Sequence, residues 1–101
     1  MGTEKIVVTV DPDLGDLIPG FLENRRRDLS TLRAALEQGD CRALQSTGHS
    51  LKGVGGGYGF TGLSAIGADI ENAAKAGDTG ALAGHIDRLA DYLERVEVVF
   101  G

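Results

Sequence analysis

Apolar side chains recur every three or four positions along four stretches of the chain, the spacing of one face of an α-helix. This pattern predicts helices over residues 17–38, 40–57, 61–76 and 79–99. Gly39, Gly59 and Gly77 separate them, and glycine commonly follows the last residue of a helix. Because the connections are short, successive helices are expected to run antiparallel. The sequence therefore predicts an all-α protein, an antiparallel up-down four-helix bundle.

Each predicted helix presents a stripe of apolar or small residues to a shared core. The stripes comprise Ile18, Leu22, Leu29, Leu32 and Leu36; Cys41, Leu44, Gly48, Leu51, Gly55 and Tyr58; Leu63, Ile66, Gly67, Ile70, Ala73 and Ala74; and Leu82, Ile86, Leu89, Leu93, Val96 and Phe100. Leu17 and Phe21 fall on one flank of the first stripe. The predicted N-caps, whose side chains can accept bonds from free backbone N–H groups, are Asp16, Asp40, Thr61 and Asp78.

Residues 1–11 are predicted to form a short extended arm. Lys5–Val10 is rich in β-branched residues, and Asp11-Pro12 ends it, where a helical turn can begin with aspartate as its cap. A single strand makes no sheet by itself. We therefore expect the arm to pack on the domain or to offer an edge to a second copy of the chain.

Composition limits the possible functions. The chain has 101 residues, of which 42% are apolar, enough for one core and one domain over residues 1–101. Its formal charge of −5 argues against nucleic-acid binding, and Arg25-Arg26-Arg27 is interpreted as a solvated helix face. The one cysteine, Cys41, gives no disulfide framework or metal cluster. With no signal peptide and no membrane-spanning stretch, we expect a cytoplasmic protein without membrane contact.

The candidate chemistry lies at His49, in the stretch TGHSLKGVGGGYGF. The residues that share its helix face are Gln45, Lys52, Gly53 and Gly56. Leu51 lies roughly 160° away around the helix, so a core on its side turns the imidazole to solvent. Because only small residues and one cation surround the ring, the pattern predicts a binding surface for a partner that carries phosphate.

Four glycines follow in the second half of this helix, where each costs about 1 kcal/mol relative to alanine. Two close approaches would offset that cost: another helix against Gly48 and Gly55, and a partner protein against Gly53 and Gly56. A nucleotide-binding loop is a poor match, because no Lys-Ser/Thr pair follows, the G-x-G-x-x-G spacing does not fit and no strand precedes it.

Phosphoryl transfer suits these residues. A neutral imidazole is a nucleophile near neutral pH, and His49 is placed to attack phosphorus. Such transfers run roughly in line through a loose transition state, so catalysis is mostly positioning plus cations, of which Lys52 is one. No acidic cluster stands beside His49 to hold Mg²⁺. We expect the domain to have no cofactor or metal of its own, with Mg²⁺ supplied by the partner.

These residues resemble the signature of histidine-containing phosphotransfer (HPt) domains. The match consists of His49-Ser50-Leu51-Lys52-Gly53, Gly59 ten positions after the histidine, and then Leu63, Ile66 and Ile70-Glu71. The chain departs from many members seven to nine positions after the histidine, where Gly56, Gly57 and Tyr58 replace polar residues.

The resemblance implies a four-helix bundle without kinase machinery. In it, His49 would accept a phosphoryl group from a receiver-domain aspartate or a sensor kinase and pass it to a response regulator. Lys52 would be the cation near the phosphate, Gly53 the small residue that lets the receiver dock, and Gly59 the turn after the histidine helix. The implied partners are the receiver domain of a response regulator and a hybrid sensor histidine kinase.

Several alternatives stay open. Leu17 and Phe21 are predicted either to be apolar docking contacts for the receiver or to pack on the N-terminal arm. The whole chain is alternatively a non-catalytic helical docking module that binds through its glycine-rich face, or the phosphodonor domain of a chemotaxis-type kinase. His85, beside the stripe that contains Leu82 and Ile86, is interpreted as a partly buried structural histidine.

Overall fold

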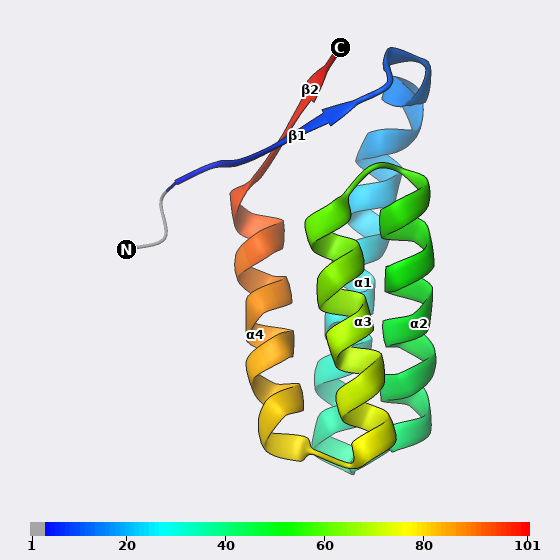
Figure 1. Cartoon of the computed structure of the whole chain (residues 1–101), viewed down its shortest axis with the longest axis vertical. Coiled ribbons are helices and arrows are strands. Elements are labelled where there is room, and N and C mark those ends of the chain that lie inside the picture. The colour runs from blue at the N-terminus through cyan, green and yellow to red at the C-terminus, as the bar shows by residue number, and fades with distance from the viewer. Residues whose placement is uncertain (1–3) are drawn as a thin grey trace.

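The computed structural model describes residues 4–101, and the first three residues of the predicted arm lie outside this range. The elements are β1 Ile6–Val10, the 3₁₀ helix η1 Pro12–Leu17, α1 Ile18–Gln38, α2 Cys41–Gly57, α3 Thr61–Ala76, α4 Thr79–Arg95 and β2 Val96–Phe100. The four helices run alternately up and down in one bundle, and the two strands lie at the end where α1 begins and α4 ends (Figure 1). The predicted bundle is confirmed.

Local signals set most helix ends. Gly39 and Gly77 follow α1 and α3 with φ of 69° and 67°, a left-handed conformation that glycine adopts without steric cost. Asp40 and Asp78 cap α2 and α4 as predicted, and each carboxylate accepts a 3.1 Å bond from the backbone N–H three residues on.

The predicted caps at Asp16 and Thr61 are wrong. Asp16 lies inside η1, which continues directly into α1, so the chain has no break that needs a side-chain cap there. Asp11 instead caps η1 by accepting a 2.9 Å bond from the backbone of Asp13. Thr61 is the first residue of α3, and the cap position is held by Phe60, whose fully buried ring fixes this corner by packing.

The last predicted helix is four residues too long. α4 ends at Arg95, and Val96–Phe100 forms β2, which pairs in parallel with β1 from Ile6↔Val96 to Val10↔Phe100. The sequence VEVVF favours a strand through its β-branched and aromatic side chains, and the arm supplies the partner. Phe100 is half-exposed rather than part of a helical core stripe. The arm packs on the domain through this pairing and through the buried Val10.

The core lies between the helices, with one shift from the predicted stripes. Its fully buried larger side chains are Val10, Leu32, Leu44, Leu51, Phe60, Leu63, Ile70, Leu82, Ile86 and Leu89. On α1, Phe21 and Ala35 are buried, while the predicted stripe members Leu22 and Leu36 are only partly buried. The face of α1 that meets the core is thus rotated toward the predicted flank.

Glycines bring α2 and α3 into backbone contact. A Cβ atom at Gly48 would lie 2.7 Å from the backbone N of Glu71, and one at Gly55 would lie 2.7 Å from the backbone N of Ser64. On the facing helix, a Cβ at Gly67 would lie 2.5 Å from the backbone N of Lys52. The predicted close approach of a helix against Gly48 and Gly55 is confirmed, and the helix is α3.

Candidate functional site

His49 stands on the outer face of α2, next to the point where α2 touches α3. Its side chain is 72% exposed, whereas Leu51, two positions later, is fully buried. A helix turns by about 100° per residue, so this contrast follows from the face that α2 directs at the core. The predicted exposure of the imidazole is confirmed.

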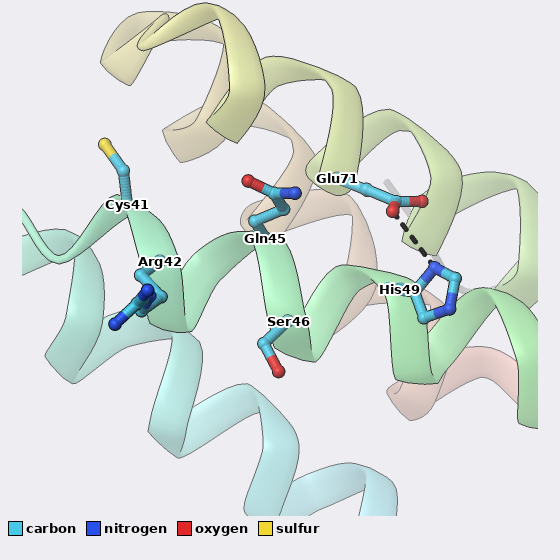
Figure 2. Close-up of a pocket in the computed structure, with 6 residues that line it drawn as sticks. All are labelled: Cys41, Arg42, Gln45, Ser46, His49 and Glu71. Atoms are coloured by element: carbon cyan, nitrogen blue, oxygen red, sulfur yellow. Dashed lines mark hydrogen bonds and ion pairs between the residues drawn. The ribbon is translucent and has the colours of Figure 1, made fainter.

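Glu71 on α3 orients the imidazole. Its Oε2 lies 3.0 Å from Nδ1 of His49, and its side chain is only 11% exposed (Figure 2). An ionised carboxylate only accepts hydrogen bonds, so the neutral ring pairs with it as the tautomer that carries its proton on Nδ1. Nε2 is then the nitrogen with the free lone pair, and in Figure 2 it faces away from Glu71.

A cation also contacts the Glu71 carboxylate. Nζ of Lys75, one turn further along α3, lies 3.7 Å from Oε2 of Glu71. The buried charge of Glu71 is therefore shared between a ring N–H and an ammonium group. Burying a carboxylate without hydrogen-bond or charge partners costs free energy, so two partners are expected for a side chain as little exposed as that of Glu71.

His49 opens onto a shallow depression of about 700 Å³. Its lining residues are Cys41, Arg42, Gln45, Ser46 and His49 of α2, together with Glu71 of α3 (Figure 2). Gln45 lies one turn before His49, as its predicted place on the same helix face requires. Apart from Cys41, the lining residues have polar side chains, and the depression leaves room for a partner's side chains or loop beside the ring.

On the other side of His49 the helix surface is nearly bare. A Cβ at Gly53 would meet nothing within 4 Å, and one at Gly56 would meet only the hydroxyl of Ser64, at 3.7 Å. Lys52 is exposed three positions after His49. Residues three apart on a helix share a face, so Lys52 lies on the same side of α2 as His49, about one turn later. α2 thus presents a nucleophilic ring, a cation and an open surface.

These features agree with the comparison with protein families. A family model for the Hpt domain matches residues 16–98. The chain belongs to the Hpt domain family. Searches of curated proteins and of solved structures gave no significant match. Hpt domains carry out histidine phosphotransfer in phosphorelays and generally partner with receiver domains.

Sequence reasoning about this Hpt domain missed Glu71. The residue stood in the motif Ile70-Glu71, but no role was assigned to it, because periodicity within α2 cannot show what α3 brings to His49. A signal was available: Glu71 lies four positions after Gly67 and three before Ala74, on the predicted core face of its helix. A carboxylate in such a place is rarely buried without a partner, so it predicts a nearby donor.

The two apolar residues of this Hpt domain that were predicted as docking contacts differ in how exposed they are. Leu17 is 52% exposed and stays available to a partner. Phe21 is only 6% exposed and stacks on Tyr58 and Phe60, with ring centroids 4.5 and 4.9 Å apart, so most of its ring is covered inside the bundle. It still lines a groove of about 350 Å³ together with Leu17, and its role as a docking contact stays a prediction.

Arg25 gives this groove a charged edge. Its guanidinium lies 5.0 Å above the ring of Phe21, and its Nε lies 2.9 Å from Oδ2 of Asp28 without the alignment of a hydrogen bond. Burial raises the pKa of the Asp28 carboxyl, although the charge of Arg25 acts in the opposite direction. Arg25 and Asp28 therefore form an ion pair that is partly buried.

His85 differs from His49 in every respect that matters for transfer. It is partly buried on α4, and its Nδ1 lies 2.9 Å from Nη1 of Arg88, which also bonds Asp69 at 3.0 Å. The guanidinium donates, so Nδ1 of His85 accepts. A ring held this way next to a cation serves a structural contact, as predicted.

Residues 4–101 contain neither a metal-binding cluster of side chains nor a membrane-spanning helix. No group of three or more His, Cys, Asp or Glu side chains there is arranged to hold a metal ion. Within the same range, no helix is both long and apolar enough to cross a membrane.

Proposed function

We propose that His49 carries the phosphoryl group of a phosphorelay on Nε2. It accepts the group from the phosphorylated aspartate of a receiver domain and passes it to the aspartate of a response regulator. The N–P bond forms as the acyl phosphate O–P bond breaks, and the aspartate leaves as a carboxylate. The proton on Nδ1 stays in its bond to Glu71. The observation that carries the proposal is this 3.0 Å bond to a ring that is 72% exposed.

Glu71 acts on the reaction through His49. When Nε2 attacks phosphorus, positive charge develops on the ring, and the carboxylate at Nδ1 stabilises it. Because the side chain of Glu71 is largely buried and held between α2 and α3, its position is set before the partner arrives. Glu71 is therefore a positioning residue with an electrostatic role.

The remaining charge in the transition state lies on the phosphoryl oxygens. Lys52 supplies one cation for them, since it is exposed on the same helix face about one turn after His49. Mg²⁺ would come from the receiver, which holds the aspartate. Gln45, Gly53 and Gly56 form the surface on which the receiver docks, with Leu17 as an apolar contact at its edge.

The test is transfer from a receiver domain of the source organism that has been charged with acetyl phosphate. Wild type, His49→Gln and His85→Gln are compared under conditions that preserve acid-labile phosphohistidine. Label in wild type and in His85→Gln, but not in His49→Gln, supports the relay. His85→Gln is the matched control, because it removes the same group from a different face.

A docking module without chemistry is the second candidate. The bare surface at Gly53 and Gly56 favours it, because such a surface admits a partner whether or not His49 reacts. The two candidates differ in one outcome. If a receiver binds wild type and His49→Gln equally and labels neither, the relay is contradicted and the docking module is supported.

A further inference from the structure

α2 is positively charged in a chain that is acidic as a whole. The whole chain has a formal charge of −5, although α1 is slightly positive because it has more arginines than acidic residues. α2 contains no acidic residue and two cations, Arg42 and Lys52. The rest of the chain is thus more negative still. An acidic partner is repelled by the net charge of the chain and attracted by the cations of α2.

The two cations of α2 lie on opposite sides of His49. Lys52 follows it by three positions, about one turn later on the same helix face. Arg42 precedes it by seven positions, which is two helical turns, or about 10 Å along the same face. Its side chain leans toward the start of α2, and Figure 2 shows the guanidinium directed away from the imidazole. Arg42 therefore lies beside the reacting atoms and outside their reach.

Arg42 is also free to take a partner. It is exposed and lines the same depression as His49. Within residues 4–101 its guanidinium forms no ion pair or side-chain hydrogen bond, whereas Arg33 lies 3.6 Å from Asp87 and Arg88 lies 3.0 Å from Asp69. An arginine presents a rigid fork of donors that matches a carboxylate.

We propose that Arg42 is a specificity-determining residue that pairs with a carboxylate on the rim of the receiver, away from the phosphorylated aspartate. This inference rests on the proposed function and deepens it by naming the partner's chemistry. The carboxylate belongs to an Asp or Glu more than about 10 Å from the acceptor aspartate, because the rise between Arg42 and His49 is about 10 Å and the guanidinium is directed further away. Arg42 contributes to encounter and orientation, while Lys52 contributes to the transfer step.

The experiment measures transfer rates from a charged receiver domain that labels wild type. The variants are Arg42→Gln, Arg42→Lys and Arg33→Gln, and rates are taken over a range of receiver concentrations at about 0.01 M and 0.15 M salt, where the Debye length is about 30 and 8 Å. Arg33→Gln is the matched control, because it removes the same charge from the α1 and α4 side of the bundle.

We expect Arg42→Gln to raise the KM for the receiver about threefold to tenfold at low salt with kcat unchanged, and the difference to shrink at high salt, as for a charge at the rim of an interface. Arg42→Lys keeps the charge but loses the paired donors, so its KM should lie between those of wild type and Arg42→Gln, and Arg33→Gln should stay near wild type. Equal effects of Arg42→Gln and Arg33→Gln on KM would mean that only the net charge of the domain matters, and would overturn the proposal.

A fall in kcat with unchanged KM in Arg42→Gln would also overturn it, because Arg42 would then act on the transfer step. These failures leave the relay standing, since wild type is labelled in each of them. If no receiver labels wild type, the proposed function fails, and the role of Arg42 fails with it.

Discussion

Gly67 is the position where the site and the fold depend on the same contact. An alanine there would place its Cβ 2.5 Å from the backbone N of Lys52 and 2.8 Å from the backbone O of Gly48, where ordinary contacts are 3.4–4 Å. Both neighbours are backbone atoms, so no rotamer change relieves the clash, and α3 must move away from α2 by about 1 Å. Overpacking of this kind costs about 1–3 kcal/mol.

Helix propensity acts in the opposite direction. Alanine in a helix interior is about 1 kcal/mol more favourable than glycine, so the net loss expected for Gly67→Ala is up to about 2 kcal/mol. Gly84→Ala on α4 is the control: a Cβ there meets nothing within 4 Å, so only the propensity gain remains. The same chemical change should thus destabilise the protein at one position and stabilise it by up to about 1 kcal/mol at the other.

Urea unfolding followed by far-UV circular dichroism measures both values. A second readout is the imidazole of His49 by nitrogen NMR, because a displaced α3 carries Glu71 away from Nδ1, and Gly67→Ala should lose the tautomer preference that Gly84→Ala keeps. If Gly67→Ala is as stable as Gly84→Ala, the backbone contact between α2 and α3 is not as tight as described, and the reasoning is refuted.

Three further predictions concern the site and the pH dependence of stability. Glu71→Gln weakens a charge-assisted hydrogen bond of about 1.5–3 kcal/mol, so labelling of His49 in a single-turnover transfer assay should slow about tenfold or more, and an unchanged rate would remove the role given to Glu71. Gly53→Ala should raise the free energy of unfolding by up to about 1 kcal/mol, since a Cβ there is free of contacts, yet weaken receiver binding measured by calorimetry; tighter or equal binding would contradict docking at Gly53. Burial raises the pKa of the Tyr92 hydroxyl, so above about pH 10 the unfolded chain loses this proton first and the free energy of unfolding falls as pH rises. Urea unfolding at pH 8 and pH 10.5 should therefore show a smaller loss for Tyr92→Phe than for wild type, and equal losses would place the alkaline sensitivity elsewhere.

What the sequence predicted well was local. The four helices, the caps at Asp40 and Asp78 and the exposure of His49 depend on residues within a few positions of one another, and these are the interactions that periodicity and cap chemistry describe. The close approach at Gly48 was also predictable, because glycine destabilises a helix interior and a close helix contact offsets that cost.

What the sequence did not predict depends on distant partners. Val96–Phe100 has both a helical phase with α4 and the composition of a strand, and the presence of β1 decides between them. Phe21 was assigned to a flank because its stacking partners, Tyr58 and Phe60, come from another part of the chain. Glu71 was missed for the same reason, since its contact with His49 joins two helices.

The terminal sheet has a consequence for the order of folding. Ile6 pairs with Val96, so nearly the whole chain lies between the two strands, and the entropy lost in closing that loop is greater than the loss in joining α2 to α3 across a short turn. Contacts between distant segments form slowly. The hairpin of α2 and α3, which holds both His49 and Glu71, is therefore expected to assemble early and the sheet to close last. The candidate site at His49 and Glu71 is then expected to depend little on whether the two ends of the chain are paired.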